Sequence, residues 1–447
     1  MSTDRMSTAL ISAQGRAGAR PLSEVEAERL IGAICFKTGP PGKIGAELEW
    51  LVRDLRDPLL PVSLDKIRQI LSRLERPGVL PGAGLLTLEP GGQVELSTAP
   101  AKNLSECVAA AGGDLAVMRE AFGQDGLALT GFGLDPLRPP RRVLDLPRYA
   151  AMEQYFDRRG HWGRLMMCST ASVQVCVDAG TAAADASGCS FRWRLLHALA
   201  PILVSAFANS PLRRGKPTGW KCTRQLVWER LDPCRTHAPA GAEPALGAED
   251  ALSGWVSYAM DADVLCVREP DGQPWTVPAG LSFRDWLRQS GPTADDLTYH
   301  LSTLFPPVRP RGHFELRMID AQPYDGWIVP VAVVAALTDD QRAAEAAMAA
   351  AEPVWRHDLS PDPWLRAARC GPSDPVLARA ARHCFEAADA SLARSGADAL
   401  VRHAVAGFAE RYVNRGRCPA DDLLEPRRPA QSRMPTQSRT STRGGAP

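Results

Sequence analysis

Alternation of apolar and acidic residues marks the stretch from Lys43 to Val52 as a β-strand. Glu47 and Glu49 stand at alternate positions of this run, between Ile44, Ala46, Leu48 and Trp50. Successive side chains of a strand point to opposite faces, so both carboxylates share one face and the apolar residues share the other. Two adjacent carboxylates repel each other unless a cation joins them. This strand is therefore either a solvated surface or part of a cation site.

A second acidic stretch follows at residues 85–97. Two short apolar runs flank the sequence Glu-Pro-Gly-Gly, which predicts a tight turn between two strands. Glu89 lies at one end of the turn, and Gln93 and Glu95 share a face of the returning strand. Taken alone, such a hairpin is equally well explained as a purely structural element.

A third strand with the same character is predicted at residues 312–320. Here Glu315 and Arg317 fall on one face, and Phe314, Leu316 and Met318 fall on the other. A cross-strand ion pair explains the acid and the arginine as well as a metal ligand beside an anion-binding group does. The recurrence of the pattern, more than any single stretch, favours a shared functional face.

Hydrophobic periodicity predicts the remaining elements. Residues 165–178 form the longest strand candidate, and Ser172, Gln174 and Cys176 alternate with valines in its second half. A further strand is expected at 127–132. Helices are expected at 23–35, 65–74, 102–122, 148–159, 191–207, 341–351, 375–393 and 398–412, the first of them capped by Ser23 and Glu26.

A basic, glycine-bearing loop is predicted at residues 213–225. Its arginines, lysines and backbone amides are typical of a phosphate-binding loop, although such runs are more commonly exposed turns. The loop does not match the GxxxxGK[ST] pattern, so the sequence indicates no P-loop.

Composition limits the possible function classes. The 447 residues contain 52 Lys and Arg against 51 Asp and Glu, which gives no basic excess for nucleic acid. No run of about 18 apolar residues is present, and the first twenty residues lack the apolar core of a signal peptide. The 11 cysteines, an odd number without metal-ligand spacing, do not describe a disulfide framework. We expect a cytoplasmic protein without nucleic-acid or membrane partners.

The chain divides into three parts by composition. Residues 1–20 lack periodicity and are expected to be flexible. Residues 21–420 contain no clear linker, which favours one large catalytic domain. Residues 421–447 are rich in Pro, Ser, Arg and Gln, and are expected to be disordered.

Together, the acidic strands offer several carboxylates and an arginine on the faces of what we expect to be one antiparallel sheet. Such a face suits two or three Mg²⁺ ions that hold a nucleoside triphosphate, because the ions neutralise both the ligands and the phosphate oxygens. Arginine then stabilises charge on the transferred phosphoryl group.

On these residues the sequence resembles the plant and proteobacterial type of glutamate-cysteine ligase, and within it the actinobacterial branch that feeds ergothioneine synthesis. The similarity runs in the same order over residues 24–337. The segments that carry it are Gly45-Ala46-Glu47-Leu48-Glu49, Glu89-Pro90-Gly91-Gly92-Gln93-Val94-Glu95-Leu96-Ser97, Thr170 with Val173-Gln174-Val175 and Asp178, Asn209-Ser210-Pro211, Arg224-Gln225 with Trp228 and Asp232, and Phe314-Glu315-Leu316-Arg317 with Asp320.

The resemblance implies an α+β fold, in which an antiparallel sheet bent into a funnel is packed with helices, as in the catalytic domain of glutamine synthetase. It also implies ATP-dependent activation of the glutamate γ-carboxylate as an acyl phosphate. Attack by the cysteine amine then gives γ-glutamylcysteine, ADP and phosphate. The substrates would be glutamate, cysteine and ATP.

The resemblance further assigns roles to single residues. Arg317 and Glu315 would be catalytic, with Arg317 facing the γ-phosphoryl group. The residues expected to bind substrate or nucleotide are Arg224, Gln174, Thr170, Trp228 and Arg235. The expected magnesium ligands are Glu47, Glu49, Glu89, Glu95 and Glu315, with Gln93 as a weaker candidate.

Two departures from the family pattern concern the substrate contacts. Many relatives have Arg-Thr where Cys168-Ser169-Thr170 stands, and Asn where Cys176 stands. A ligase of the same fold that uses another amine or acid therefore stays open. So do supply of the product to glutathione instead of ergothioneine, and a cation-binding protein without turnover.

Overall fold

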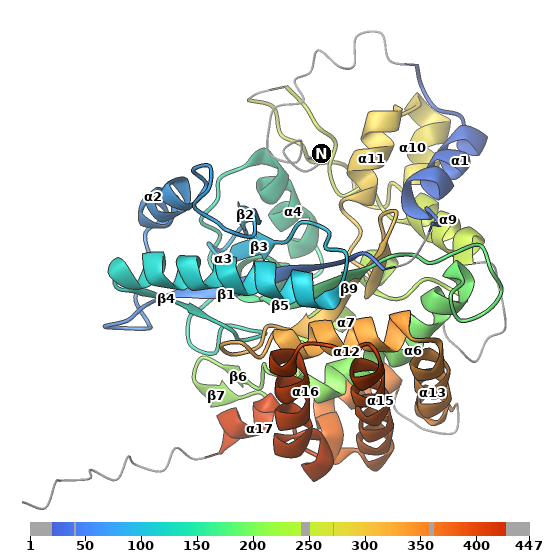
Figure 1. Ribbon diagram of the computed structural model, residues 1–447. Helices are drawn as coiled ribbons and strands as arrows, with labels where there is room; N and C mark the ends of the chain where they lie inside the picture. Colours follow the sequence, from blue (N-terminus) through green and yellow to red (C-terminus); the bar gives the residue numbers. More distant parts are fainter. Residues whose placement is uncertain (1–19, 40–41, 243–250, 271, 357–361, 426–447) are drawn as a thin grey trace, which may run out of the picture.

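The computed structural model describes residues 20–39, 42–242, 251–270, 272–356 and 362–425 (Figure 1). The first helix, α1 (Glu24–Cys35), begins as expected at a capping box. The Ser23 side chain accepts a hydrogen bond from the backbone of Glu26, and the Glu26 carboxylate accepts one from the backbone of Ser23. The predicted flexible segment lies outside the described residues, apart from residue 20.

A seven-stranded antiparallel sheet forms the centre of the molecule. Its strands follow the order β2-β3-β1-β5-β9-β8, and β4 pairs with the far half of β1. The strands are β1 (Ile44–Asp54), β2 (Leu85–Leu88), β3 (Val94–Ser97), β4 (Leu127–Thr130), β5 (Ser172–Val177), β8 (Val308–Pro310) and β9 (Phe314–Asp320). The three predicted acidic stretches thus belong to one sheet, with β1 between β3 and β5.

The two faces of the sheet differ as the alternation predicts. Ile44, Ala46, Leu48 and Trp50 are buried in the main hydrophobic core, whereas Glu47 is only partly buried on the opposite face. Helices cover the apolar face: α6 (Cys189–Ala206) packs against β9, and α12 (Ile328–Asp339) packs against β5 (Figure 1). Eleven of the twelve residues of α12 are buried, which explains its lack of a polar stripe.

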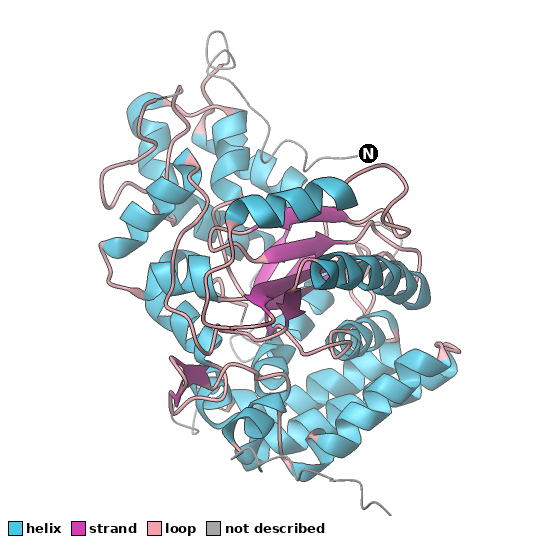
Figure 2. Ribbon diagram, turned by 90° about the vertical axis from the view of Figure 1, so that its left-hand side faces the viewer, coloured by secondary structure: helices cyan, strands magenta, loops and turns pink. Residues whose placement is uncertain are grey.

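The remaining helices surround this centre (Figures 1 and 2). They include α2 (Leu64–Leu74), α3 (Leu104–Gln124), α4 (Pro147–Asp157), α5 (Trp162–Ser169), α7 (Thr223–Leu231), α8 (Pro233–Thr236), α9 (Ala251–Asp261), α10 (Phe283–Ser290), α11 (Ala294–Leu301), α13 (Gln341–Ala351), α14 (Pro363–Cys370), α15 (Pro375–Arg394), α16 (Ala399–Arg411) and α17 (Pro419–Leu424). Short 3₁₀ turns follow at Glu352–Trp355, Gly371–Ser373 and Val413–Arg415. Within the described part of the chain, no helix is both long and apolar enough to cross a bilayer.

The predicted strand at residues 165–178 is wrong in its first half. Residues up to Ser169 form α5, and only Ser172–Val177 form β5. An apolar run as short as Leu165 to Met167 fits either element, and tertiary packing decides. The end of α5 packs on the hairpin turn so closely that a Cβ on Gly91 would lie 2.3 Å from the Cys168 carbonyl oxygen.

The structure changes two further expectations, the start of the C-terminal tail and the form of the basic loop. The expected disordered tail begins too early, because α17 extends to Leu424 and its Lys221–Asp421 ion pair ties it to the basic loop. The rest of that tail lies outside the described residues. The basic loop itself contains a two-stranded ribbon, β6 (Leu212–Arg213) and β7 (Lys216–Pro217), which is separate from the main sheet (Figure 2).

Candidate active site

The acidic face of the sheet is centred on β1. Antiparallel pairing places Glu49 opposite Glu95 of β3, and Glu47 opposite Gln174 of β5. The next strand, β9, carries Glu315 and pairs with the other edge of β5. We use the name acidic face for the surface formed by Glu47, Glu49, Glu89 and Glu95. The sheet thus brings carboxylates together from stretches about forty to fifty residues apart.

Protein donors orient two of these carboxylates. Glu49 accepts hydrogen bonds from the backbone nitrogen of Ser172 at 2.8 Å and from Nε2 of Gln174 at 2.9 Å. Glu95 accepts one from Oγ1 of Thr87, also at 2.8 Å. These bonds fix the positions of the side chains but bring no positive charge to them.

The acidic face carries more negative charge than its surroundings compensate. Burial, followed by repulsion from neighbouring acids, raises the pKa of Glu89 to about 7 and the pKa of Glu95 to about 8. The same causes raise the pKa of Glu47 well above its usual range, with Glu315 and Glu95 as the repelling groups. Burial also raises the pKa of Glu49. A cation that joined these carboxylates would remove the repulsion.

The donor set fits Mg²⁺ in its chemistry. Carboxylate and amide oxygens are the ligands that this ion prefers, and the buried Oε1 of Gln93 has no hydrogen-bonding partner. Its Nε2 donates to the carbonyl oxygens of Met167 and Thr170, which fixes the orientation of the amide. Among the described residues, however, no three acidic, His or Cys side chains converge as they stand on one metal position. Binding would require the glutamates to rotate toward a shared ion.

Glu315 differs from the other predicted metal ligands because arginines already neutralise it. Its side chain is fully buried, and Nη2 of Arg309 donates to both carboxylate oxygens at 2.8 and 3.0 Å. Arg311 lies 3.5 Å away, and Arg317 also forms an ion pair with it. Burial alone would raise the pKa of Glu315, but the three arginines hold it well below its usual range. The structure therefore favours Glu315 as an anchor for arginines and gives no support to its prediction as a magnesium ligand.

A chain of polar contacts connects this arginine cluster with the acidic face. Arg317 donates to the Glu315 carboxylate and to Oε1 of Gln174. Nε2 of Gln174 in turn donates to Glu49. The buried Nε of Arg317 has no partner among the described residues. The guanidinium is thus held beside the acidic face, and its Nε–H is available to a ligand.

Arg224 lies in the first turn of α7 and reaches the same region. Its backbone nitrogen donates to Oγ of Ser210 at 3.1 Å, and its Nη2 donates to the carbonyl oxygen of Arg317 at 2.7 Å. Its guanidinium stacks on Trp228, with 4.4 Å between the guanidinium carbon and the ring centroid. These contacts place a second arginine next to Arg317.

Asp320, at the end of β9, anchors the loop that carries Arg224. Its carboxylate accepts hydrogen bonds from the Asn209 backbone at 2.8 Å, from Ser210 Oγ at 2.7 Å and from Cys222 Sγ at 3.3 Å. Close packing requires a glycine opposite it, because a Cβ on Gly133 would lie 2.1 Å from the Asp320 carboxyl carbon. Asp320 appeared in the family motif, but the sequence analysis gave it no role.

Three predicted substrate-binding residues, Thr170, Trp228 and Arg235, form hydrogen bonds mainly with other protein groups. Oγ1 of Thr170 donates to the Met166 carbonyl oxygen at 2.6 Å, and Nε1 of Trp228 donates to the Phe305 carbonyl oxygen at 3.2 Å. The ring of Trp228 supports the guanidinium of Arg224.

Arg235 is fully buried, and protein acceptors use its donors. They are the side chains of Asp232, Tyr155 and Thr303 and the carbonyl oxygens of Thr303 and Asp263. Its guanidinium has no donor left for a ligand. The prediction that Arg235 binds substrate is therefore wrong for this structure, in which it joins α8 to its neighbours.

Sequence reasoning missed the arginines around Glu315 and a third arginine near Glu89. Arg309 lies directly opposite Glu315 in the β8–β9 pair, and a signal was present in the alternating Arg-Pro-Arg before Gly312. Arg148 of α4 donates from Nη2 to the Ser302 carbonyl oxygen at 3.0 Å, and its charge opposes the raised pKa of Glu89. No local pattern marks Arg148, because only the fold brings it to the acidic face.

Comparison with known families decides the relationship of this chain. The profile of "Glutamate-cysteine ligase family 2 (GCS2)" matches residues 43–442. The chain belongs to this family. The resemblance identified from the sequence is thereby confirmed, and membership of the glutamate-cysteine ligase family makes the chain a ligase.

Relatives within the family cover most of the chain. The glutamate-cysteine ligase EgtA of Mycolicibacterium smegmatis is 40% identical over 411 residues, which are 90% of this chain and 91% of that protein. EgtA of Mycobacterium tuberculosis is 40% identical over 405 residues, with 88% and 87% covered. The chloroplastic glutamate-cysteine ligase B of Oryza sativa subsp. japonica is 30% identical over 305 residues, with 63% and 59% covered.

A solved structure supports the fold independently. The glutamate-cysteine ligase of Francisella tularensis, crystallised in complex with AMP, has a TM-score of 0.50 and 12% identity, and the match covers 87% of this chain and 85% of that chain. At this identity the likeness concerns the fold alone. Together with the sheet described above, it confirms the predicted α+β fold of an antiparallel sheet packed with helices.

Proposed function

We propose that this ligase joins the γ-carboxylate of L-glutamate to the amine of L-cysteine at the expense of ATP, giving γ-glutamylcysteine, ADP and phosphate. The observation that carries the proposal is the contact chain from Glu49 through Gln174 to Arg317, in a chain that belongs to the glutamate-cysteine ligase family. The contact chain supports the proposal because it joins a carboxylate that could hold a cation to a guanidinium that could bind a phosphoryl group. We also propose that residues 21–420 act as one catalytic unit in the cytoplasm.

Two or three Mg²⁺ ions would be held by Glu47, Glu49, Glu89 and Glu95, with Gln93 as a further oxygen ligand. When bound, the ions would neutralise phosphate oxygens of ATP and the developing charge on the transferred group. The protein contributes a rigid backbone for these side chains, since Glu47, Glu49 and Glu95 lie on paired strands and Glu89 directly follows β2. Deprotonation of these side chains must accompany metal binding, because their pKa values are raised in its absence.

Arg317 would bind the γ-phosphoryl group as it moves to the glutamate γ-carboxylate. The role of Glu315 is then to fix this guanidinium, together with Gln174, before the substrates arrive. A preorganised cation costs no rearrangement when negative charge develops, which is why its position matters for the rate. Attack by the cysteine amine on the acyl phosphate expels phosphate, and the amine proton leaves as the new amide bond forms.

Arg224 would bind a substrate carboxylate. Its stacking on Trp228 and its bond to the Arg317 carbonyl oxygen leave the buried Nε without a partner among the described residues. Thr170, which follows α5 directly, would stabilise the part of the site that the end of α5 forms. Gln174 would orient Glu49 toward the metal ions and Arg317 toward the phosphoryl group.

Release of ADP in the presence of ATP, Mg²⁺, glutamate and each amino acid in turn tests the proposal. We expect cysteine to stimulate release most strongly, and mass spectrometry to detect γ-glutamylcysteine. The Glu47→Gln variant should lose activity by orders of magnitude with the fold retained, while Glu386→Gln, on the exposed side of α15, should behave as the wild type. Failure of cysteine to stimulate would instead indicate a ligase for another amine.

The relatives named EgtA also lead us to propose that the product enters ergothioneine synthesis. Deletion of the gene in its own host should then abolish ergothioneine, as measured by mass spectrometry. Loss of glutathione with unchanged ergothioneine would reject this assignment but not the ligase reaction.

A further inference from the structure

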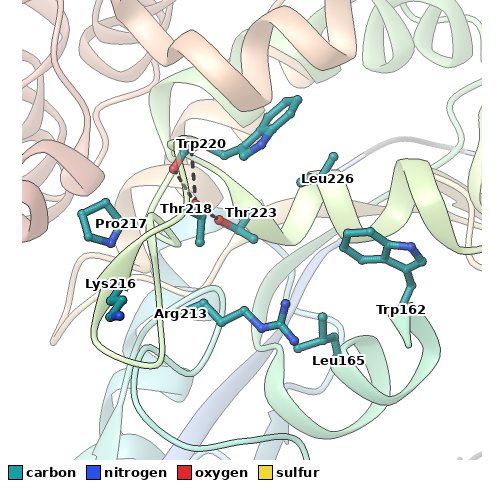
Figure 3. A pocket seen from close by; sticks show the side chains of 9 residues that line it. All are labelled: Trp162, Leu165, Arg213, Lys216, Pro217, Thr218, Trp220, Thr223 and Leu226. Carbon is teal, nitrogen blue, oxygen red and sulfur yellow. Dashed lines mark hydrogen bonds between the residues drawn. The ribbon is translucent and has the colours of Figure 1, made fainter. Parts of the chain in front are cut away.

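A cavity of about 320 Å³ lies beside the basic ribbon, and the proposed reaction does not use it (Figure 3). The ribbon β6–β7, the helix α5 and the helix α7 supply its walls. The lining residues are Trp162, Leu165, Arg213, Lys216, Pro217, Thr218, Trp220, Thr223 and Leu226. None of them belongs to the acidic face or to its arginines. The volume is in the range of cavities that bind small molecules.

The helix α7 separates this cavity from the candidate active site. Thr223 and Leu226 line the cavity and are three residues apart, so they lie on one side of the helix. Arg224 and Trp228 are four residues apart on another side, where Arg224 contacts the backbone of Arg317. A ligand in the cavity would therefore be distinct from the substrates bound at the acidic face.

The charge of the lining favours an anion. Arg213 and Lys216 lie opposite each other in the β6–β7 pair, and neither side chain has an ion pair or hydrogen bond with another described residue. Figure 3 shows the Arg213 guanidinium extending from the ribbon toward Leu165 of α5. The lining contains no acidic residue among those that the structure describes. Arginine with free donors matches carboxylate and phosphate groups.

The rest of the lining favours a flat apolar group attached to the anion. The indole rings of Trp162 and Trp220, with Leu165 and Leu226, form the surface beyond the two cations (Figure 3). Aromatic rings of this kind bind flat groups with little loss of side-chain entropy. Trp220 is itself supported from outside the cavity, since the guanidinium of Arg369 lies 6.0 Å from its ring centroid.

The ribbon is held in place without any ligand. The backbone nitrogen of Gly215 donates to the Pro136 carbonyl oxygen at 2.7 Å, which fixes the turn between β6 and β7. The hydroxyl of Thr218 lies 2.7 Å from the hydroxyl of Thr223, which joins the ribbon to α7. The cations are thus presented by an ordered wall, and binding need not order it.

We propose that this cavity is a binding site for a small organic anion, in which Arg213 and Lys216 bind a carboxylate or phosphate group and Trp162 and Trp220 contact a flat apolar group. The ligand needs both groups, because Arg213 and Lys216 would bind only its anionic group and the two indole rings would contact only its apolar group.

Isothermal titration of the full-length protein with 1-naphthyl phosphate and with 1-naphthoate tests the proposal. EDTA is present so that metal-dependent binding at the acidic face does not contribute. We expect both compounds to bind at one site. Inorganic phosphate lacks the apolar ring and 1-naphthol lacks the anionic group, so each should bind at least about tenfold more weakly. Comparison of the two naphthyl anions identifies which anionic group the site prefers.

Two single variants locate the site. Arg213→Gln should weaken binding of the naphthyl anions at least about tenfold, with ligase activity unchanged. Arg214→Gln is the matched control, because Arg214 is the next residue of the same ribbon but is exposed and does not line the cavity. Equal affinities of the two variants would overturn the proposal. So would binding of 1-naphthol as tight as that of the anions, or no detectable binding of either anion.

Discussion

Replacement of Glu315 by glutamine separates the two roles that this residue can have. In the structure its carboxylate is fully buried and forms ion pairs with Arg309, Arg311 and Arg317. Glutamine keeps the shape of the side chain but removes the negative charge from these ion pairs. Removing one partner from a buried ion pair costs about 3–5 kcal/mol, so we expect a clear fall in the free energy of unfolding.

The effect on the reaction follows from the position of Arg317. Without the carboxylate, the guanidinium loses its ion pair and keeps its hydrogen bond to Gln174 and its position over the Phe305 ring. Misplacement of a catalytic group by about 1 Å costs about 10²-fold in rate, and we expect kcat of Glu315→Gln to fall by at least that factor. Since the residue does not hold metal in this interpretation, the Mg²⁺ concentration that gives half-maximal activity should stay unchanged.

Steady-state ADP release as a function of Mg²⁺ concentration measures both quantities, with Glu47→Gln as the comparison. That variant loses a proposed ligand, so it should need more Mg²⁺ and recover activity in part at high concentration. The reasoning on Glu315 is refuted if Glu315→Gln also shifts the Mg²⁺ requirement upward, or if excess Mg²⁺ rescues it as it rescues Glu47→Gln. Thermal unfolding in EDTA shows whether each variant is folded.

Three further predictions concern pH, substrate binding and packing. The raised pKa values of Glu89 and Glu95 mean that the folded, metal-free protein binds more protons than the unfolded chain, so its stability should fall as the pH rises from about 4.5 through 7 and 8. Thermal unfolding in EDTA at pH 6 and 8.5 checks this, and Mg²⁺ should raise the melting temperature more at pH 8.5; a metal-free protein that is more stable at pH 8.5 contradicts it. Asp320→Asn should raise the KM for the amino-acid substrate that we propose Arg224 to bind by about tenfold, because helix α7 would be misplaced, with a smaller change in kcat. An unchanged KM would show that Asp320 does not act through Arg224. Gly91→Ala should destabilise the fold by about 1–3 kcal/mol, because its Cβ would meet the Cys168 backbone. Gly112→Ala, with open space around it in α3, should stabilise the fold by up to about 1 kcal/mol. Urea unfolding that changed the stability of both variants in the same direction would contradict this packing argument.

The alternation of side chains was sufficient to predict which residues of a single strand share a face. It places Glu47 with Glu49 and Glu315 with Arg317, because the period of a strand is independent of its neighbours. It contains no information on the order of strands, so the sequence could not place Glu49 opposite Glu95 or Gln174 beside Arg317. The first depends on the pairing of β1 with β3, and the second depends on the pairing of β5 with β9, whose register shifts between Val173 and Val175.

The two site predictions that the contacts do not support, Glu315 as a metal ligand and Arg235 as a substrate-binding residue, have a common physical origin. Glu315 looks like its fellow glutamates in sequence, and only the β8–β9 pairing reveals that Arg309 neutralises it. Arg235 looks like a ligand-binding arginine, but apart from the nearby Asp232 its acceptors come from segments about 30 to 80 residues away. The fate of a charged side chain depends on its distant neighbours, and local patterns do not contain them.

The side chain of Gln174 also constrains how this site can evolve. It donates to Glu49 on one side and accepts from Arg317 on the other, so the amide acts as a neutral spacer between a region built to attract cations and a region built to attract anions. A glutamate here would pair with Arg317 but repel Glu49, and a lysine would do the reverse. An uncharged group with both a donor and an acceptor can hydrogen-bond to Glu49 and Arg317 together. It keeps the negative and the positive region adjacent without a direct ion pair between these two residues.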